Sequence, residues 1–238
     1  MDSSIVSLLG AALSASAAIA SGWFTRQSVT SERLAAADEL AMRVREPLLQ
    51  SAFNLQSRIY NIVRLKFLER FMAETCPAED REYAVENTLY LLGQYFCWVE
   101  ILRRESQFLD PKDRARNRAV ANHLEQIREL FTSSEIPEPV FRTFRGEQRA
   151  MGEVMLTPTE GPRGPRWECM GYAAFVRQRE DEHNDHWFRR ARADLDVLLK
   201  EPGRHHYRLV LLQHALLDLV DVLDPDGECV SMVMRERL

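Results

Sequence analysis

Apolar residues recur at intervals of three and four positions through most of the chain after Pro47, which is the spacing of one helix face. The first such segment runs from Leu48 to about Glu74, and the second from about Asp80 to Leu109. Pro77 separates the two segments, and long amphipathic helices joined this closely are expected to pair antiparallel. Further helices are predicted over 111–131, 146–156 and 207–223, and residues 168–179 and 185–200 are predicted to form either two helices or one kinked helix.

Prolines and glycines mark the breaks between these segments. Residues 133–145 contain two prolines, and residues 157–167 contain three prolines and two glycines, so both are predicted to be loops. Patterns typical of strands are nearly absent. The sequence therefore predicts an all-α protein with an antiparallel bundle of five to seven helices.

A different pattern precedes the helices, because residues 5–24 form one uncharged, alanine- and serine-rich run. At 1.5 Å per residue, a helix of this length would be about 30 Å long, which matches the hydrocarbon core of a bilayer. The run therefore predicts a single transmembrane helix. A cleaved signal peptide is the alternative, but Met1 is followed by an acidic residue, and no Lys or Arg precedes the run.

The charges on either side of the run orient the chain. Asp2 lies before it, whereas Arg26, Arg33, Arg43 and Arg45 follow it, and positive charge is retained on the cytoplasmic side. We therefore expect a single-pass protein of the cell membrane with its N-terminus outside and the bulk of the chain in the cytoplasm. The predicted organisation is a membrane anchor (1–27), a juxtamembrane helix (28–46), a cytoplasmic bundle (47–225) and a C-terminal tail (226–238).

Partners are suggested by the same segments. Residues 5–24 would contact the lipid bilayer, and small residues four positions apart, such as Gly10 and Ser14, would let two anchors approach each other as a homo-oligomer. The net charge of −5 gives no reason to expect a nucleic acid partner. An unidentified protein partner of the bundle is expected instead.

The four cysteines are far apart, and none forms a C-x-x-C pair. This spacing fits neither a zinc site nor a disulfide framework, and it is typical of reduced cytosolic thiols. The basic residues are almost all arginine, a bias that indicates a GC-rich bacterial genome.

Polar side chains interrupt the apolar pattern of several helices and form the candidate site. The candidate ligand-binding residues between the helices are Arg58, Arg103, Arg145, Arg149 and Glu153. The four arginines could bind a phosphate or carboxylate. Two glycines near the last three would be costly within a helix unless another element packs closely there. The alternative is that these arginines and neighbouring glutamates form ion pairs that fix the helix register.

Known catalytic patterns are absent from the sequence. It contains no G-x-S-x-G elbow, P-loop, G-x-G-x-x-G or H-E-x-x-H, and Cys97 and His214 lie in apolar helical segments that predict packed rather than reactive side chains. Glu180 and His183 have the E-x-x-H spacing but lack a second such pair, so we expect no metal and no cofactor. The repeat of Asp218, Asp221 and Asp224 predicts a solvated helix end.

Two functions remain open. The first is a membrane-tethered cytoplasmic interaction or regulatory module without catalytic activity. The second is a membrane-bound enzyme or small-molecule sensor with an Arg/Glu-lined pocket. Convergence of the five candidate residues on a cavity would favour the second function, and complete pairing among them without a cavity would favour the first.

Overall fold

The computed structural model describes residues 43–105, 114–161, 164–178 and 185–238. These residues are mostly helical and contain eight α-helices, which confirms the helical class but exceeds the predicted five to seven. None of the helices in the described ranges is both long and apolar enough to span a membrane. The predicted membrane span, residues 5–24, lies outside these ranges.

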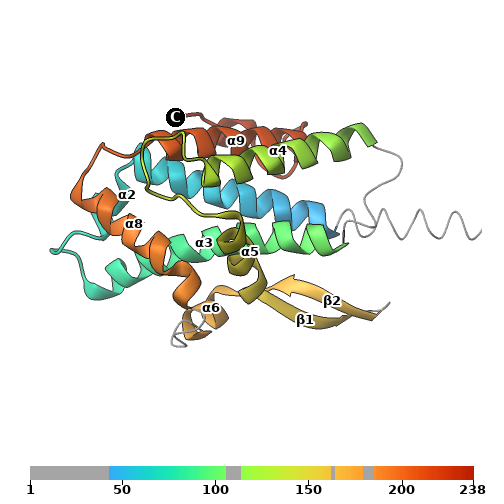
Figure 1. Cartoon of the computed structure of the whole chain (residues 1–238), viewed down its shortest axis with the longest axis horizontal. Helices are drawn as coiled ribbons and strands as arrows, with labels where there is room; N and C mark the ends of the chain where they lie inside the picture. The colour runs from blue at the N-terminus through green and yellow to red at the C-terminus, as the bar shows by residue number, and fades with distance from the viewer. Residues whose placement is uncertain (1–42, 106–113, 162–163, 179–184) are drawn as a thin grey trace, which may run out of the picture.

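Four long helices run along the longest dimension of the molecule (Figure 1). They are α1 (43–63), α3 (Ala78–Glu105), α4 (Arg114–Thr132) and α9 (Tyr207–Leu223). Arg43, the first described residue of α1, forms an ion pair of 2.5 Å with Glu105 at the end of α3. Further along, Arg58 of α1 bonds Asn87 of α3. Helices α1 and α3 are therefore antiparallel, as predicted.

Helix α9 runs antiparallel to α1 on another side of the bundle. Arg45 donates from Nε to the carbonyl oxygen of Leu223 at 2.8 Å, and Gln213 donates to the side chain of Gln56 at 3.1 Å. The side chains of both glutamines are buried, so the pair fixes the register of α1 and α9 from inside the bundle.

Helix α4 is antiparallel to α9, and arginine side chains join the two helices at both ends. Arg116 near the start of α4 donates to the carbonyl oxygen of Val222, whereas Arg208 of α9 donates to the carbonyl oxygen of Leu130 near the end of α4. The four long helices thus alternate in direction, which is the up-down-up-down arrangement of a four-helix bundle.

Apolar side chains from all four helices fill the space between them. Completely or almost completely buried members include Leu48, Leu49, Ala52, Leu89, Leu92, Phe131, Leu212, Leu216, Leu219 and Val220. These positions recur at three- and four-residue intervals, so the periodicity of the sequence correctly identifies the buried face of each helix.

The chain between α4 and α9 forms an outer layer against α3. Its elements are α5 (Arg145–Val154), β1 (Leu156–Gly161), β2 (Gly164–Cys169), α6 (Tyr172–Gln178), η2 (His186–Phe188) and α8 (Arg189–Lys200). Figure 1 shows α5, α6 and the hairpin gathered beside α3. This layer turns one side of α3, which would otherwise face solvent, into the wall of two grooves described below.

The antiparallel hairpin of β1 and β2 corrects the prediction that residues 157–167 form a loop. Leu156 pairs with Cys169, and Pro158 pairs with Trp167. In a two-stranded sheet each strand has an unpaired edge, where proline's missing N–H costs no ladder bond. Glu168 and Cys169, predicted to begin a helix, belong to β2.

The first predicted helix of the bundle is also divided. Lys66 adopts a left-handed backbone conformation (φ 54°), so α1 ends before it, and α2 (Phe67–Phe71) begins after it. Pro47, after which the bundle was predicted to begin, lies within the helix of residues 43–63. One helix therefore crosses the predicted boundary between residues 46 and 47.

Candidate functional site

Three of the five candidate residues line one groove between α3, α4 and α5. Arg103, Arg145 and Arg149 surround a cavity of about 220 Å³. The remaining lining residues are Phe96, Val99, Glu100, Arg128 and Gln148. We call this cavity the arginine groove. Four guanidinium groups and one carboxylate therefore converge on a space large enough for a small anion.

Gly152 allows the two walls of the arginine groove to lie close together. A Cβ atom on Gly152 would be 2.6 Å from the carbonyl oxygen of Phe96 in α3, and Cβ atoms in proteins essentially never come this close to another atom. Gly146, in contrast, would meet nothing within 4 Å. The prediction that close packing explains these glycines is confirmed for Gly152 and wrong for Gly146.

Gln148 joins α5 to α4 beneath the arginine groove. Its Nε2 donates to the carbonyl oxygen of Thr143 at 2.8 Å and to the hydroxyl of Thr132 at 3.0 Å. At the start of α5, the side chain of Glu147 accepts the N–H of Phe144 at 2.7 Å and caps the helix. These bonds fix the helix turn that carries Arg145 and Arg149.

On the α3 side, Glu100 organises the arginines. Arg103 donates to both of its carboxylate oxygens at 2.7 Å, and Arg104 donates to one of them at 2.7 Å. Burial alone would raise the pKa of Glu100, but the hydrogen bonds from the two arginines outweigh burial and hold its pKa below the usual value. Glu100 therefore remains ionised at the wall of the groove.

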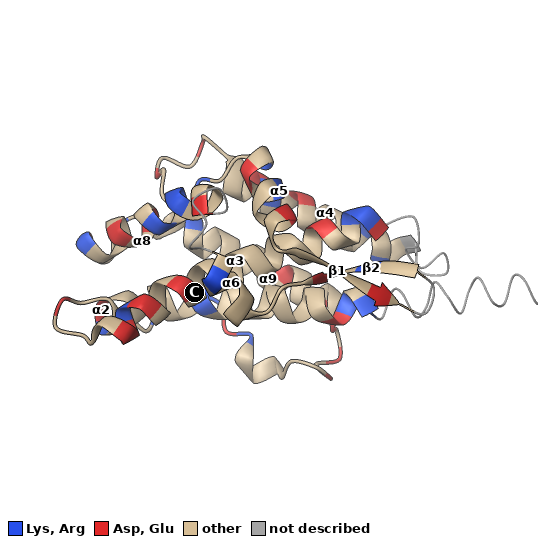
Figure 2. Ribbon diagram, turned by 90° about the horizontal axis from the view of Figure 1, so that it is seen from below, with Lys and Arg blue, Asp and Glu red and all other residues tan. Residues whose placement is uncertain are grey.

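The arginines of α4 and α5 also have carboxylate partners. Arg145 bonds Glu125 at 2.7 Å and also bonds Glu129, while Arg149 bonds Glu153 at 2.9 Å. Figure 2 shows the resulting mixture of basic and acidic residues along α4 and α5. Both sequence interpretations thus find support, because these arginines converge on a cavity and are also paired.

Two candidate residues are not part of the lining. Glu153 lies beside the groove as the partner of Arg149 and approaches Arg104 to 3.6 Å. Arg58 lies elsewhere, on α1, where its guanidinium sits 3.9 Å from the ring centroid of Phe67 and donates to Asn87 at 2.6 Å. Because α5 packs on a different side of α3 from α1, Arg58 does not join the other arginines.

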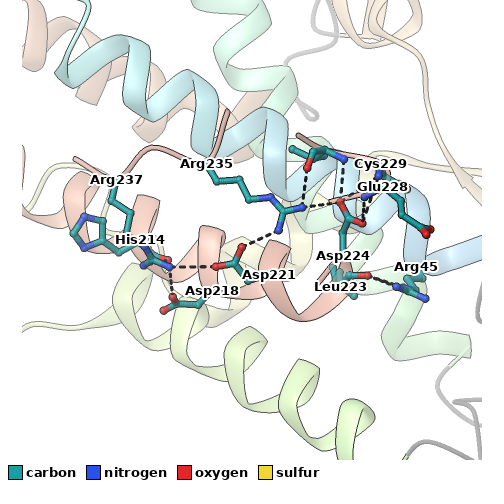
Figure 3. Close-up of polar contacts among 11 residues, drawn as sticks. Arg45, His214, Asp218, Asp221, Leu223, Asp224, Glu228, Cys229, Arg235 and Arg237 are labelled. Carbon is teal, nitrogen blue, oxygen red and sulfur yellow. Dashed lines mark hydrogen bonds and ion pairs between the residues drawn. The ribbon is translucent and has the colours of Figure 1, made fainter. Parts of the chain in front are cut away.

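A second polar cluster, which sequence reasoning missed, joins the C-terminal tail to α9 (Figure 3). The carboxylate of Asp224 accepts backbone N–H groups from Glu228 and Val230, at 3.0 and 2.9 Å. Arg235 then donates to Asp224 at 2.7 Å and to Asp221 at 2.8 Å. We call this cluster the C-terminal clasp.

The C-terminal clasp corrects the prediction of a solvated helix end for Asp224, whose side chain is 6% exposed, but not for Asp218 and Asp221, which are 35% and 45% exposed. Arg237 pairs with Asp218 at 2.7 Å and approaches Asp221 to 3.4 Å, so the two arginines of the tail together pair with all three aspartates. The sequence did contain an indication, since aspartates three residues apart share a helix face and two arginines follow nearby. The local sequence, however, does not specify that the C-terminal tail folds back against α9.

The clasp holds an apolar tip in solvent. Met232, Val233 and Met234 form a 3-10 turn, η3, and are 59%, 89% and 59% exposed. The residue after them, Arg235, is buried in the clasp. Three consecutive exposed apolar side chains on an anchored loop are a candidate contact surface, and methionine is frequent where a surface adapts to a partner.

The side chains considered for catalysis are packed or hydrogen-bonded. Cys97 is completely buried, as predicted for a packed side chain, and a hydrogen bond with Cys169, together with burial, raises the pKa of its thiol. His214 contacts the carbonyl oxygen of Leu238 at 2.9 Å. Within the described ranges, no group of His, Cys, Asp and Glu could hold a metal ion, and Glu180 and His183 lie outside those ranges.

Comparisons of the chain with protein-family models, with curated proteins and with solved structures find no match. The geometry described above therefore carries the functional proposal.

Proposed function

We propose that the protein is a membrane-tethered helical interaction module whose bundle binds a protein partner in the cytoplasm. The observation that carries this proposal is the apolar tip, Met232–Met234, held out by the C-terminal clasp. A flexible tail could bury these side chains against the bundle, whereas Arg235 and Asp224 fix the loop so that the tip remains exposed. The uncharged run of residues 5–24, followed by arginines, supports membrane attachment.

The membrane part of the proposal is tested by fractionation. The full chain should remain in the membrane pellet after alkaline extraction, and a variant lacking residues 1–25 should move to the soluble fraction. A full chain that is already soluble without detergent would contradict the tether but not the interaction surface.

The interaction part is tested by purification from native membranes. Val233→Glu places a charge at the centre of the tip, and Leu65→Glu makes the same change at another exposed apolar residue. We expect a partner protein to copurify in stoichiometric amount with the wild type and with the Leu65→Glu variant. The same partner should be absent when the Val233→Glu variant is purified. The same set of proteins with all three chains would contradict the proposal.

The arginine groove supports a second candidate function, the sensing of a small anion. A guanidinium group has five N–H donors. In the described structure, Arg149 bonds Glu153 through Nε, and Arg145 bonds its partners through Nη2. Their remaining donors can bind an oxyanion at the mouth of the groove.

This second function is tested with inorganic phosphate and with citrate. The melting temperature of the full chain in nonionic detergent should rise with either anion, and the Arg145→Met, Arg149→Met double variant should lose the rise. Arg204→Met, which removes a more exposed arginine far from the groove, should keep it. An equal rise in all chains would indicate a general salt effect and contradict the anion site.

A further inference from the structure

A second groove lies between the first half of α3 and α6, away from both the arginine groove and the C-terminal clasp. Its cavity is about 450 Å³, within the size range of ligand pockets. The chemically distinctive residues of its lining are Glu79, Glu82, Tyr83, Glu86, Tyr172 and Arg177. We call it the tyrosine groove.

Two tyrosine rings form a corner of the tyrosine groove. The ring centroids of Tyr83 and Tyr172 are 6.3 Å apart, and the ring planes meet at 80°. Tyr172 is held in place by Tyr90, whose ring lies 5.4 Å away, and Tyr90 in turn contacts the buried Phe175. Tyr83 is 52% exposed, although tyrosine is a large side chain that is usually more buried.

Carboxylates lie along the same wall. Glu79, Glu82 and Glu86 are spaced three and four residues apart on α3 and so share one face of the helix. Glu86 is buried and paired with Arg192 at 2.6 Å. Glu79 and Glu82 are exposed, and neither forms an ion pair with any residue in the described ranges.

The negative charge of these carboxylates affects the pKa of a tyrosine in the corner. The pKa of Tyr172 is raised, first by burial and then by the negative charge of Glu86 and the neighbourhood of Tyr83 and Glu82. On the inner side, the positive charge of Arg58 acts against this rise in the pKa of Tyr172. The outer side of the corner faces the groove.

We propose that the tyrosine groove binds an arginine or lysine side chain of a peptide segment in a partner protein. The faces of tyrosine rings attract guanidinium and ammonium groups, and Glu79 and Glu82 supply negative charge beside them. An anionic ligand would be repelled by the same carboxylates. A peptide fits better than a small free cation because the cavity of about 450 Å³ has room for more than one side chain beside the two exposed carboxylates.

Arg177 gives the proposal a specific prediction. It is exposed on α6 and lines the groove, so its positive charge competes with an incoming cation. Removing this side chain should therefore strengthen binding, whereas removing the carboxylates or Tyr83 should weaken it. An unspecific attraction between a basic peptide and an acidic protein would not depend on Tyr83.

The test measures fluorescence anisotropy of a labelled peptide of alternating arginine and alanine, added to the full chain in nonionic detergent. Tyr83→Leu should weaken binding about two- to fivefold. Glu79→Gln with Glu82→Gln should weaken it and reduce its dependence on salt, and Arg177→Ala should strengthen it. The matched control is Glu228→Gln, an exposed carboxylate in the loop after α9, which should bind like the wild type.

All substituted side chains in the groove are exposed, so each variant should keep the melting temperature of the wild type. Equal binding by all variants, or no binding to the wild type, would overturn the proposal. Free arginine amide that competes as strongly as the peptide would overturn the assignment to a peptide. Because the groove is independent of the apolar tip, Val233→Glu should leave this binding unchanged, and failure here would not affect the proposed function.

Discussion

Arg235 and Asp224 form an ion pair of 2.7 Å in which the two side chains are only 5% and 6% exposed. Asp224 also accepts backbone N–H groups of the loop that follows it, and Arg235 also donates to the carbonyl oxygen of Val230 at 2.8 Å. Both charges lose water contacts when they are buried, and hydrogen bonds within the protein replace most of these contacts. The pair is the reason why the C-terminal tail has a fixed position.

Arg235→Met should lower the free energy of unfolding by about 3 kcal/mol, because it leaves the buried carboxylate of Asp224 without its cation. Arg237→Met is the matched control, since that arginine is 43% exposed and should contribute at most about 1 kcal/mol. Urea unfolding of both variants measures the difference. Equal effects of the two substitutions would show that the clasp does not depend on a buried pair.

Gly152→Ala should destabilise the protein by about 1–3 kcal/mol, because the added methyl group would collide with the backbone oxygen of Phe96, which cannot rotate away. Gly146→Ala lies in the same helix in open space and should be neutral or stabilising by about 0.5 kcal/mol. Thermal unfolding distinguishes the two. If both substitutions have the same sign, close packing of α5 against α3 does not explain Gly152.

Arg208→Met should cost about 3 kcal/mol and loosen the end of α4. The guanidinium of Arg208 is buried and donates to the carbonyl oxygens of Ser133 at 2.9 Å and Glu138 at 3.1 Å, as well as to Leu130. Hydrogen exchange should accelerate at the last turn of α4 and remain slow at its centre. Arg204→Met, on the 75% exposed neighbour, should change neither quantity.

Asp194 should make stability depend on pH. Its carboxylate accepts the N–H of Phe141 at 2.8 Å, yet burial raises its pKa to about 6. Between about pH 4 and 6 the unfolded chain ionises this group while the folded chain keeps it protonated. This contribution to stability is therefore present at low pH and is lost as the pH rises through 6.

Asp194→Asn removes the titrating group but keeps an oxygen that can accept the bond from Phe141. The variant should therefore gain stability relative to the wild type as the pH rises from 4 to 7, measured by urea unfolding at each pH. Asp196→Asn, two residues away on the same helix and exposed, is the control and should follow the wild-type profile. Parallel profiles for all three chains would show that Asp194 does not titrate in this range.

The candidate site was only partly predictable from sequence. The density of polar residues in helical segments correctly indicated that Arg103, Arg145 and Arg149 meet other helices. It included Arg58 wrongly in the same group, because periodicity identifies the buried face of a helix but not which helix packs against it. Arg128 was missed for the same reason, as its place in the groove depends on how α4 crosses α5.

The sequence by itself determined the helical class, the antiparallel pairing of the first two long helices and the buried face of each, because these follow from the spacing of apolar residues along the chain. Only the tertiary structure decided which arginines share a groove, how a proline-containing segment forms a hairpin, and that Arg235 returns to Asp224. These contacts join residues distant in sequence, or depend on strand pairing, and their free energy arises only once the helices have packed.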